Sequence, residues 1–182
     1  MISIVVIALG SIPIIWVSRR SLLRPTSHGF ARFFAFEAIL ALVVVNAPCW
    51  FDRPFGGQQI FSWLLLGTSI GLVASGVALL RRFGSSLPAT EGATEFEWEN
   101  TASLVTTGVY RYIRHPMYSS LLFLTWGALL KSVSTTTLAV AVIATIALVV
   151  TARVEETENV ARFGEEYREY MKRTRRFVPF VV

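Results

Sequence analysis

The chain has 182 residues, of which 53% are hydrophobic and 16% are charged. A soluble domain rarely carries so little charge for its surface, and continuous hydrophobic runs exclude a β-barrel. The net charge of +5 is ascribed to helix ends near membrane lipids; no nucleic-acid-binding module is present, and we expect no nucleic-acid partner. One cysteine and two histidines form no cluster of zinc ligands, so no metal site is expected. The composition therefore predicts an all-α polytopic membrane protein.

The first three membrane spans are predicted at residues 1–17, 33–50 and 60–80. Each run is close to the length of about 20 residues that a helix needs to cross a bilayer. Arg19, Arg20 and Arg24 follow the first run. Because positive residues gather on the cytoplasmic side, we expect the N-terminus outside.

Two features inside these spans call for an interpretation. Gly67, Gly71 and Ser75 recur every four residues, which places them on one stripe and predicts a close contact between helices. Glu37 is an acid within a span, and such acids are functional candidates. Pairing with the nearby Arg32, or reaching toward the membrane interface, is the favoured interpretation of Glu37.

Two more spans are predicted in the second half of the chain, at residues 116–130 and 135–152, joined by a short turn. Pro116 favours a helix start, because its missing N–H would be unpaired there anyway. With five spans and the N-terminus outside, every Lys and Arg except Arg53 and Lys131 lies on the cytoplasmic side. This strong bias supports the predicted topology.

The topology brings two polar segments, residues 104–118 and 153–156, to the same cytoplasmic face. We expect one domain over residues 1–182, with the first three spans in 1–82 and a cofactor-binding, catalytic half in 83–182. The active site and the C-terminus are then cytoplasmic.

Residues 154–172 predict an amphipathic helix on that face. One side is apolar and aromatic, with Val160, Phe163, Tyr167, Tyr170 and Met171. We expect this helix either against the cytoplasmic membrane surface or over the bundle. The basic residues that follow it, from Lys172 to Arg176, are interpreted as an anchor to lipid headgroups.

The segment 104–118 combines tyrosines, arginines and a histidine between apolar runs. Arg114 and His115 lie at a helix N-terminus, where free N–H groups favour an anion. Glu155 and Glu156 offer negative charge for a cation. The pair of segments therefore suits a ligand with a carboxylate, a positive centre and a flat group. Ordinary interface residues have the same chemistry, so the residues alone leave both interpretations open.

The order and spacing of the motifs resemble the isoprenylcysteine carboxyl methyltransferase family, which is related to the membrane phospholipid methyltransferases. The residues that carry the resemblance are Gly108, Tyr110, Arg114, His115, Pro116, Tyr118, Gly127, Ser132, Glu155, Glu156, Phe163, Gly164, Tyr167, Tyr170 and Pro179. The resemblance runs from about residue 104 to the C-terminus and implies an integral-membrane methyltransferase that uses S-adenosylmethionine and releases S-adenosylhomocysteine.

The resemblance also implies which residues hold the cofactor and which act in catalysis. The cofactor side comprises Ala102, Ser103, Leu104, Val105, Tyr110, His115, Pro116, Met117, Tyr118 and Glu155. The catalytic group comprises Arg114, Arg153, Glu155 and Glu156. In the family a substrate-side arginine lies one turn before the acid. Here Thr151 occupies that position and Arg153 follows two residues later, so these two residues are the predicted substrate contacts.

The expected methyl acceptor is lipophilic and enters laterally between spans. The carboxylate of an isoprenylcysteine-like substrate is favoured, with a phospholipid amine or a small thiol as alternatives. A carboxylate needs no base, whereas an amine or thiol needs proton removal by Glu155, Glu156 or a tyrosine. Two other classes stay open: a sterol-reductase-like protein that uses NADPH, and a non-enzymatic membrane subunit.

Overall fold

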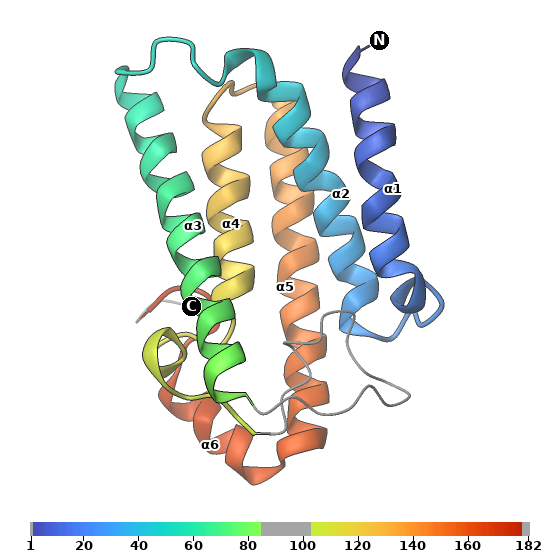
Figure 1. Cartoon of the computed structure of the whole chain (residues 1–182), viewed down its shortest axis with the longest axis vertical. Coiled ribbons are helices and arrows are strands. Elements are labelled where there is room, and N and C mark those ends of the chain that lie inside the picture. Colours follow the sequence, from blue (N-terminus) through green and yellow to red (C-terminus); the bar gives the residue numbers. More distant parts are fainter. Residues whose placement is uncertain (1, 85–102, 180–182) are drawn as a thin grey trace.

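The computed structural model describes residues 2–84 and 103–179, and every regular element in these ranges is helical. Figure 1 shows the long helices side by side, with α6 across one end of the bundle. The elements are α1 (Ile2–Leu22), α2 (His28–Asn46), η1 (Ala47–Cys49), α3 (Gly57–Phe83), η3 (Gly108–Arg111), α4 (Pro116–Leu129), α5 (Thr135–Phe163) and α6 (Glu165–Arg173).

Four stretches in the described residues are long and apolar enough to cross a membrane: Ile2–Leu22, His28–Cys49, Gly57–Phe83 and Thr135–Phe163. These helices make the chain a membrane protein. The helix α4 has 14 residues, a length of about 21 Å, which is short for a span of about 20 residues. It lies between α3 and α5 within the bundle (Figure 1). A count of five spans therefore stays a prediction.

The helices α3 and α4 approach each other closely, but at glycines other than the predicted Gly67 and Gly71. A Cβ atom on Gly67 or Gly71 would meet nothing within 4 Å, so this stripe faces away from the bundle. The contact between α3 and α4 instead uses Gly127, whose Cβ would lie 2.9 Å from Cγ of Leu66, and Gly76, which faces the start of α4. A four-residue spacing identifies a stripe on a helix, but the neighbouring helix decides which stripe it contacts.

Glu37 accepts a hydrogen bond of 2.6 Å from the hydroxyl of Ser11. This bond joins α1 to α2 inside the bundle, a contact that the sequence did not indicate. Pairing of Glu37 with Arg32 stays a prediction.

Polar side chains of α2 and α3 bind the carbonyl groups at the C-terminal end of α4. Asn46 donates to the carbonyl of Ala128 at 2.8 Å, and Ser62 donates to that of Gly127 at 2.7 Å. The last carbonyls of a helix have no partner within the helix, and no water reaches them inside a membrane. These bonds therefore hold the short α4 in register with its neighbours.

We expect Asn46→Leu to lower the stability of the fold by about 1 kcal/mol, because the carbonyl of Ala128 loses its side-chain donor and keeps only backbone N–H donors, such as that of Lys131 at 3.2 Å. The measurement is the thermal unfolding midpoint of the purified protein in detergent. An unchanged midpoint would show that another group satisfies this carbonyl.

The helix α5 continues past the predicted end of the fifth span. It runs for 29 residues to Phe163, about 44 Å, so the predicted separate helix 154–172 is wrong at its start. The break comes at Gly164, with φ 61° and ψ −131°. Such a backbone conformation is open essentially to glycine alone, so this residue decides where α6 turns away.

We expect Gly164→Ala to destabilise the protein by about 1–3 kcal/mol through backbone strain, since its Cβ would meet nothing within 4 Å. Gly71→Ala is the matched control, because it also enters open space but lies in a helix, where alanine is favoured. Thermal unfolding of both variants in detergent tests the prediction. Equal midpoints for the two would contradict it.

Candidate active site

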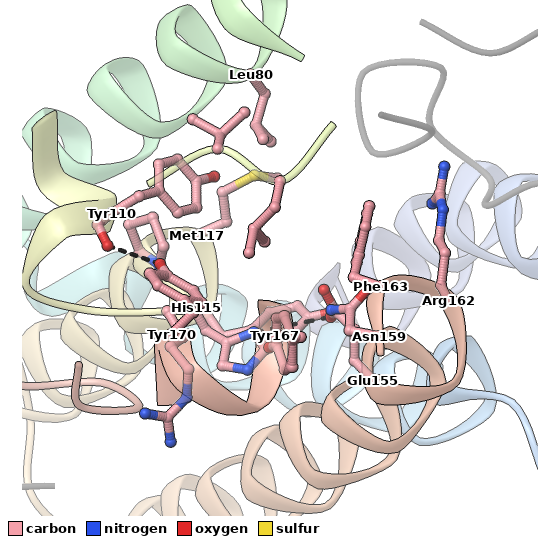
Figure 2. A pocket seen from close by; sticks show the side chains of 15 residues that line it. Leu80, Tyr110, His115, Met117, Glu155, Asn159, Arg162, Phe163, Tyr167 and Tyr170 are labelled. Atoms are coloured by element: carbon pink, nitrogen blue, oxygen red, sulfur yellow. Dashed lines mark hydrogen bonds and ion pairs between the residues drawn. The ribbon is translucent and has the colours of Figure 1, made fainter. Parts of the chain in front are cut away.

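A pocket lies at the α6 end of the bundle, between the end of α3, the segment 104–118, the last turns of α5, and α6 (Figure 2). Its lining residues are Leu80, Leu104, Val105, Tyr110, Arg114, His115, Pro116, Met117, Tyr118, Glu155, Asn159, Arg162, Phe163, Tyr167 and Tyr170. The structure thus brings together two polar segments about 40 residues apart in the sequence, as the predicted hairpin required.

The segment before α4 is held in place from both sides. Gly108 has φ +59°, and a Cβ there would lie 2.6 Å from Cδ1 of Leu79, so a side chain has neither the backbone conformation nor the space. On the other side, Arg114 N–H donates to the carbonyl of Arg175 at 2.8 Å, and Arg175 N–H donates to that of Tyr112 at 3.0 Å. The C-terminal tail is therefore paired with the motif segment, and α4 begins at Pro116 as predicted.

Glu156 is the centre of an ion cluster behind the pocket. Its side chain is 6% exposed and accepts hydrogen bonds from Arg114 Nε at 2.8 Å and from Arg176 Nη2 at 2.5 Å. Nε2 of His115 lies 3.5 Å from one of its oxygens. A buried carboxylate between two guanidinium groups is held in one position. Glu156 therefore joins α5, the motif segment and the tail.

Arg114 is equally engaged. Besides Glu156, its Nη1 donates to the carbonyls of Thr174 at 2.5 Å and Met171 at 3.2 Å. Its guanidinium thus ties the start of α4 to the end of α6, and the predicted binding of a ligand carboxylate would have to compete with these bonds.

Glu155 has a different environment from its neighbour. Its side chain is 29% exposed, lines the pocket, and lies 3.9 Å from Nδ1 of His115. It makes no hydrogen bond to any other residue that the structure describes. Figure 2 shows it beside Asn159, one helical turn further along α5. The pocket therefore contains one carboxylate with unused hydrogen-bonding capacity.

Aromatic rings form much of the remaining wall. The ring of His115 is stacked on Tyr118 with centroids 5.4 Å apart, and Phe163 is stacked on Tyr167 at 6.5 Å. The hydroxyl of Tyr170 donates to the carbonyl of Tyr110 at 2.6 Å, which fastens α6 over the pocket. Burial raises the pKa of Tyr167 and of Tyr170 well above its usual value. Both therefore stay protonated phenols, which disfavours either of these two tyrosines as the base.

The predicted cofactor residues lie around this pocket, with two exceptions. Ser103 does not line it, since its hydroxyl instead donates to the carbonyl of Phe83 at 3.2 Å. Ala102 lies outside the described residues. The assigned roles of the others stay predictions.

The predicted substrate contacts are not part of the pocket. Thr151 is fully buried, and its hydroxyl donates to the carbonyl of Ala147 at 2.7 Å within α5. Arg153 lines a separate groove between α4 and α5. Thr151 does lie one turn before Glu155 on α5. The packing of α5 against its neighbours decides which of its side chains face the pocket, and neither Thr151 nor Arg153 does.

Several lining residues had no predicted role in the site. Leu80, Asn159 and Arg162 were not identified, and the aromatic face of 154–172 was expected against the membrane or over the bundle. Of these alternatives the structure supports the second, since Tyr167 and Tyr170 are buried. Asn159 lies four residues after Glu155, a spacing that places two residues on one helical face.

The comparisons with known proteins show the family of the chain. The sequence model of the phospholipid methyltransferase family matches residues 58–166, more than half of the chain. The chain belongs to this family. The match confirms the resemblance to the related membrane methyltransferases. It spans α3, α4, α5 and the first residues of α6, the helices that surround the pocket.

A relative of known name is the methanethiol S-methyltransferase of Crocosphaera subtropica. It is 32% identical over 76 residues, which cover 42% of this chain and 29% of the relative. Because the chain covers so little of that relative, the likeness does not carry over the activity of the whole protein. No solved structure matches the chain.

Proposed function

We propose that this member of the family uses S-adenosylmethionine as methyl donor and binds it in the pocket of Figure 2. The observation that supports the proposal most directly is the Glu155 carboxylate among aromatic walls, which makes no hydrogen bond to another described residue and lies 3.9 Å from Nδ1 of His115. When bound, the cofactor supplies a methyl group on a sulfonium, which is its reactive centre.

The polar and aromatic groups of the pocket suit each part of this cofactor. The Glu155 carboxylate suits a cationic group, and the rings of Tyr118 and Phe163 offer surfaces for a flat base and for a positive centre. The N-terminus of α4 after His115 offers free N–H groups for a carboxylate. We assign Glu155 to the cationic group of the cofactor and the start of α4 to its carboxylate.

We further propose that the acceptor is a small thiol rather than an isoprenylcysteine carboxylate. Of the arginines predicted to act in catalysis, Arg114 is engaged with Glu156 and Arg153 lies outside the pocket, so neither is placed to bind a substrate carboxylate there. The name of the Crocosphaera relative supports a thiol. A thiol must lose its proton, and since both oxygens of Glu156 accept from guanidinium groups, Glu155 is the proton acceptor that the pocket offers.

A calorimetric titration of the purified, full-length protein with S-adenosylhomocysteine tests the cofactor assignment. We expect binding of this product and none of NADPH, which separates the proposal from a sterol-reductase-like protein. Absence of heat and of any thermal shift with S-adenosylhomocysteine would contradict the assignment, and would favour a non-enzymatic membrane subunit.

The acceptor is tested separately, by transfer of a labelled methyl group to methanethiol, to farnesylcysteine and to phosphatidylethanolamine in vesicles. We expect turnover of the thiol. If the protein binds S-adenosylhomocysteine but methylates one of the lipophilic acceptors, the thiol is wrong and the cofactor assignment stands.

We propose that the α6 end faces the cytoplasm and the N-terminus lies outside. Arg81 and Arg82 end α3, and Arg19 and Arg20 end α1, at the same end of the bundle as α6 (Figure 1). Such clusters mark the cytoplasmic side. A fluorescent reporter fused to the C-terminus that folds only in the cytoplasm is expected to be bright, and a dark fusion would reverse the orientation.

A further inference from the structure

A second hollow lies outside the candidate active site, along α4 and α5. It has a volume of about 460 Å³, within the range of roughly 300–1,000 Å³ typical of ligand sites. The side chains of Leu122, Phe123, Trp126 and Val149 make its walls apolar. Trp126 is 38% exposed, so this groove opens to the outside of the bundle.

One end of the groove carries two guanidinium groups. Arg153 and Arg176 both line it, and no carboxylate does. Arg153 is exposed, and its guanidinium makes no hydrogen bond or ion pair with another described residue. Arg176 bonds to Glu156 through Nε and Nη2, which leaves its Nη1 without a bond among the described residues. The groove therefore ends at the guanidinium of Arg153, whose charge no described carboxylate neutralises, and at the unbonded Nη1 of Arg176.

The depth of these arginines in the membrane identifies the kind of anion they meet. From Thr135 to Ala152 the helix α5 is uncharged over 18 residues, a length of about 27 Å. This is close to the roughly 30 Å of the hydrocarbon core. Arg153 follows directly, so it lies at headgroup depth while the groove walls lie beside the lipid chains.

We propose that this groove binds one anionic phospholipid of the bilayer. Its phosphate contacts Arg153 and Nη1 of Arg176, and one acyl chain lies between α4 and α5 along Trp126 and Val149. The proposal is independent of the methyl acceptor. Because Arg176 contacts both the groove and Glu156, the bound lipid also holds the C-terminal tail against the ion cluster.

Native mass spectrometry of the full-length protein with equal amounts of phosphatidylglycerol and phosphatidylcholine of the same chains tests the proposal. We expect a preferred phosphatidylglycerol adduct, reduced about fivefold in Arg153→Gln, since one arginine near anionic lipid contributes roughly that factor. Arg175→Gln is the matched control, because it removes the same charge from the exposed part of the tail and is expected to keep the adduct.

A second variant separates the groove from surface charge. Thr145 lines the groove and is partly buried, so Thr145→Phe fills the space of the acyl chain while both arginines stay. We expect it to lose the adduct with an unchanged thermal midpoint. An adduct that survives Thr145→Phe, an equal loss in Arg153→Gln and Arg175→Gln, or equal binding of phosphatidylcholine would overturn the proposal. Methylation of the bound lipid would overturn it too, by making the groove the acceptor site.

Discussion

Glu156→Gln is expected to lower the stability of the protein by about 3–5 kcal/mol, the cost of breaking a buried ion pair from one side. The carboxylate is 6% exposed and pairs with Arg114 and Arg176. An amide cannot accept bonds at both ends, so one guanidinium group faces an N–H donor and stays charged in a dry environment. The measurement is thermal unfolding in detergent, where a midpoint about 6–20 °C lower is expected for a chain of this size.

Glu165→Gln is the control for this loss. Glu165 pairs with Arg168 on α6, but the two side chains are 69% and 56% exposed. Exposed pairs contribute little, so we expect a change of about 0–1 kcal/mol. A Glu156→Gln midpoint as close to the wild type as that of Glu165→Gln would show that the cluster is not needed for the fold.

Glu155→Gln is expected to keep the fold and to lose the cofactor. The carboxylate makes no hydrogen bond to another described residue, and Nδ1 of His115 lies 3.9 Å from it, so its removal breaks no hydrogen bond. A charge-assisted contact is worth about 1.5–3 kcal/mol, which corresponds to an affinity for S-adenosylhomocysteine lowered about 10- to 100-fold. Calorimetric titration of the purified variant measures this change.

The unfolding midpoint of Glu155→Gln is measured alongside, so that a loss of affinity is not confused with unfolding. Neighbouring carboxylates on one helix thus have different expected effects: Glu156→Gln lowers the stability of the fold, and Glu155→Gln keeps the fold but lowers the affinity for the cofactor product. If Glu155→Gln binds S-adenosylhomocysteine as tightly as the wild type, another group must bind the cationic part of the ligand. If Glu155→Gln is unfolded, Glu155 has a structural role.

Local signals predicted several features correctly because their causes are local. Pro116 begins α4, since proline favours the first position of a helix, and α5 begins at Thr135, the first residue of the predicted span. The long apolar runs form the long helices as predicted, because hydrophobicity is also a local property of the chain. The ends of helices were less predictable: α5 continues 11 residues past Ala152, because the backbone bonds of a helix do not stop at the end of its apolar part.

Side-chain partners across the bundle were beyond prediction. The bond of Arg176 to Glu156, 20 residues away in the chain, was not predicted, and the predicted contact of Arg176 with lipid headgroups stays a prediction. The position of Arg153 in the groove between α4 and α5 was not predicted either, and its predicted contact with the substrate stays a prediction. Both outcomes depend on which face of each helix meets a neighbour.

By itself the sequence determined the membrane class, the helical architecture, the family and the segments that surround the pocket, since hydrophobicity, proline position and motif spacing are properties of the chain. Only the tertiary structure decided that Glu156 belongs to a buried cluster while Glu155 lines the pocket. The two are adjacent in sequence and identical in chemistry. A helix turns by about 100° per residue, so one faces the paired arginines and the other the open pocket.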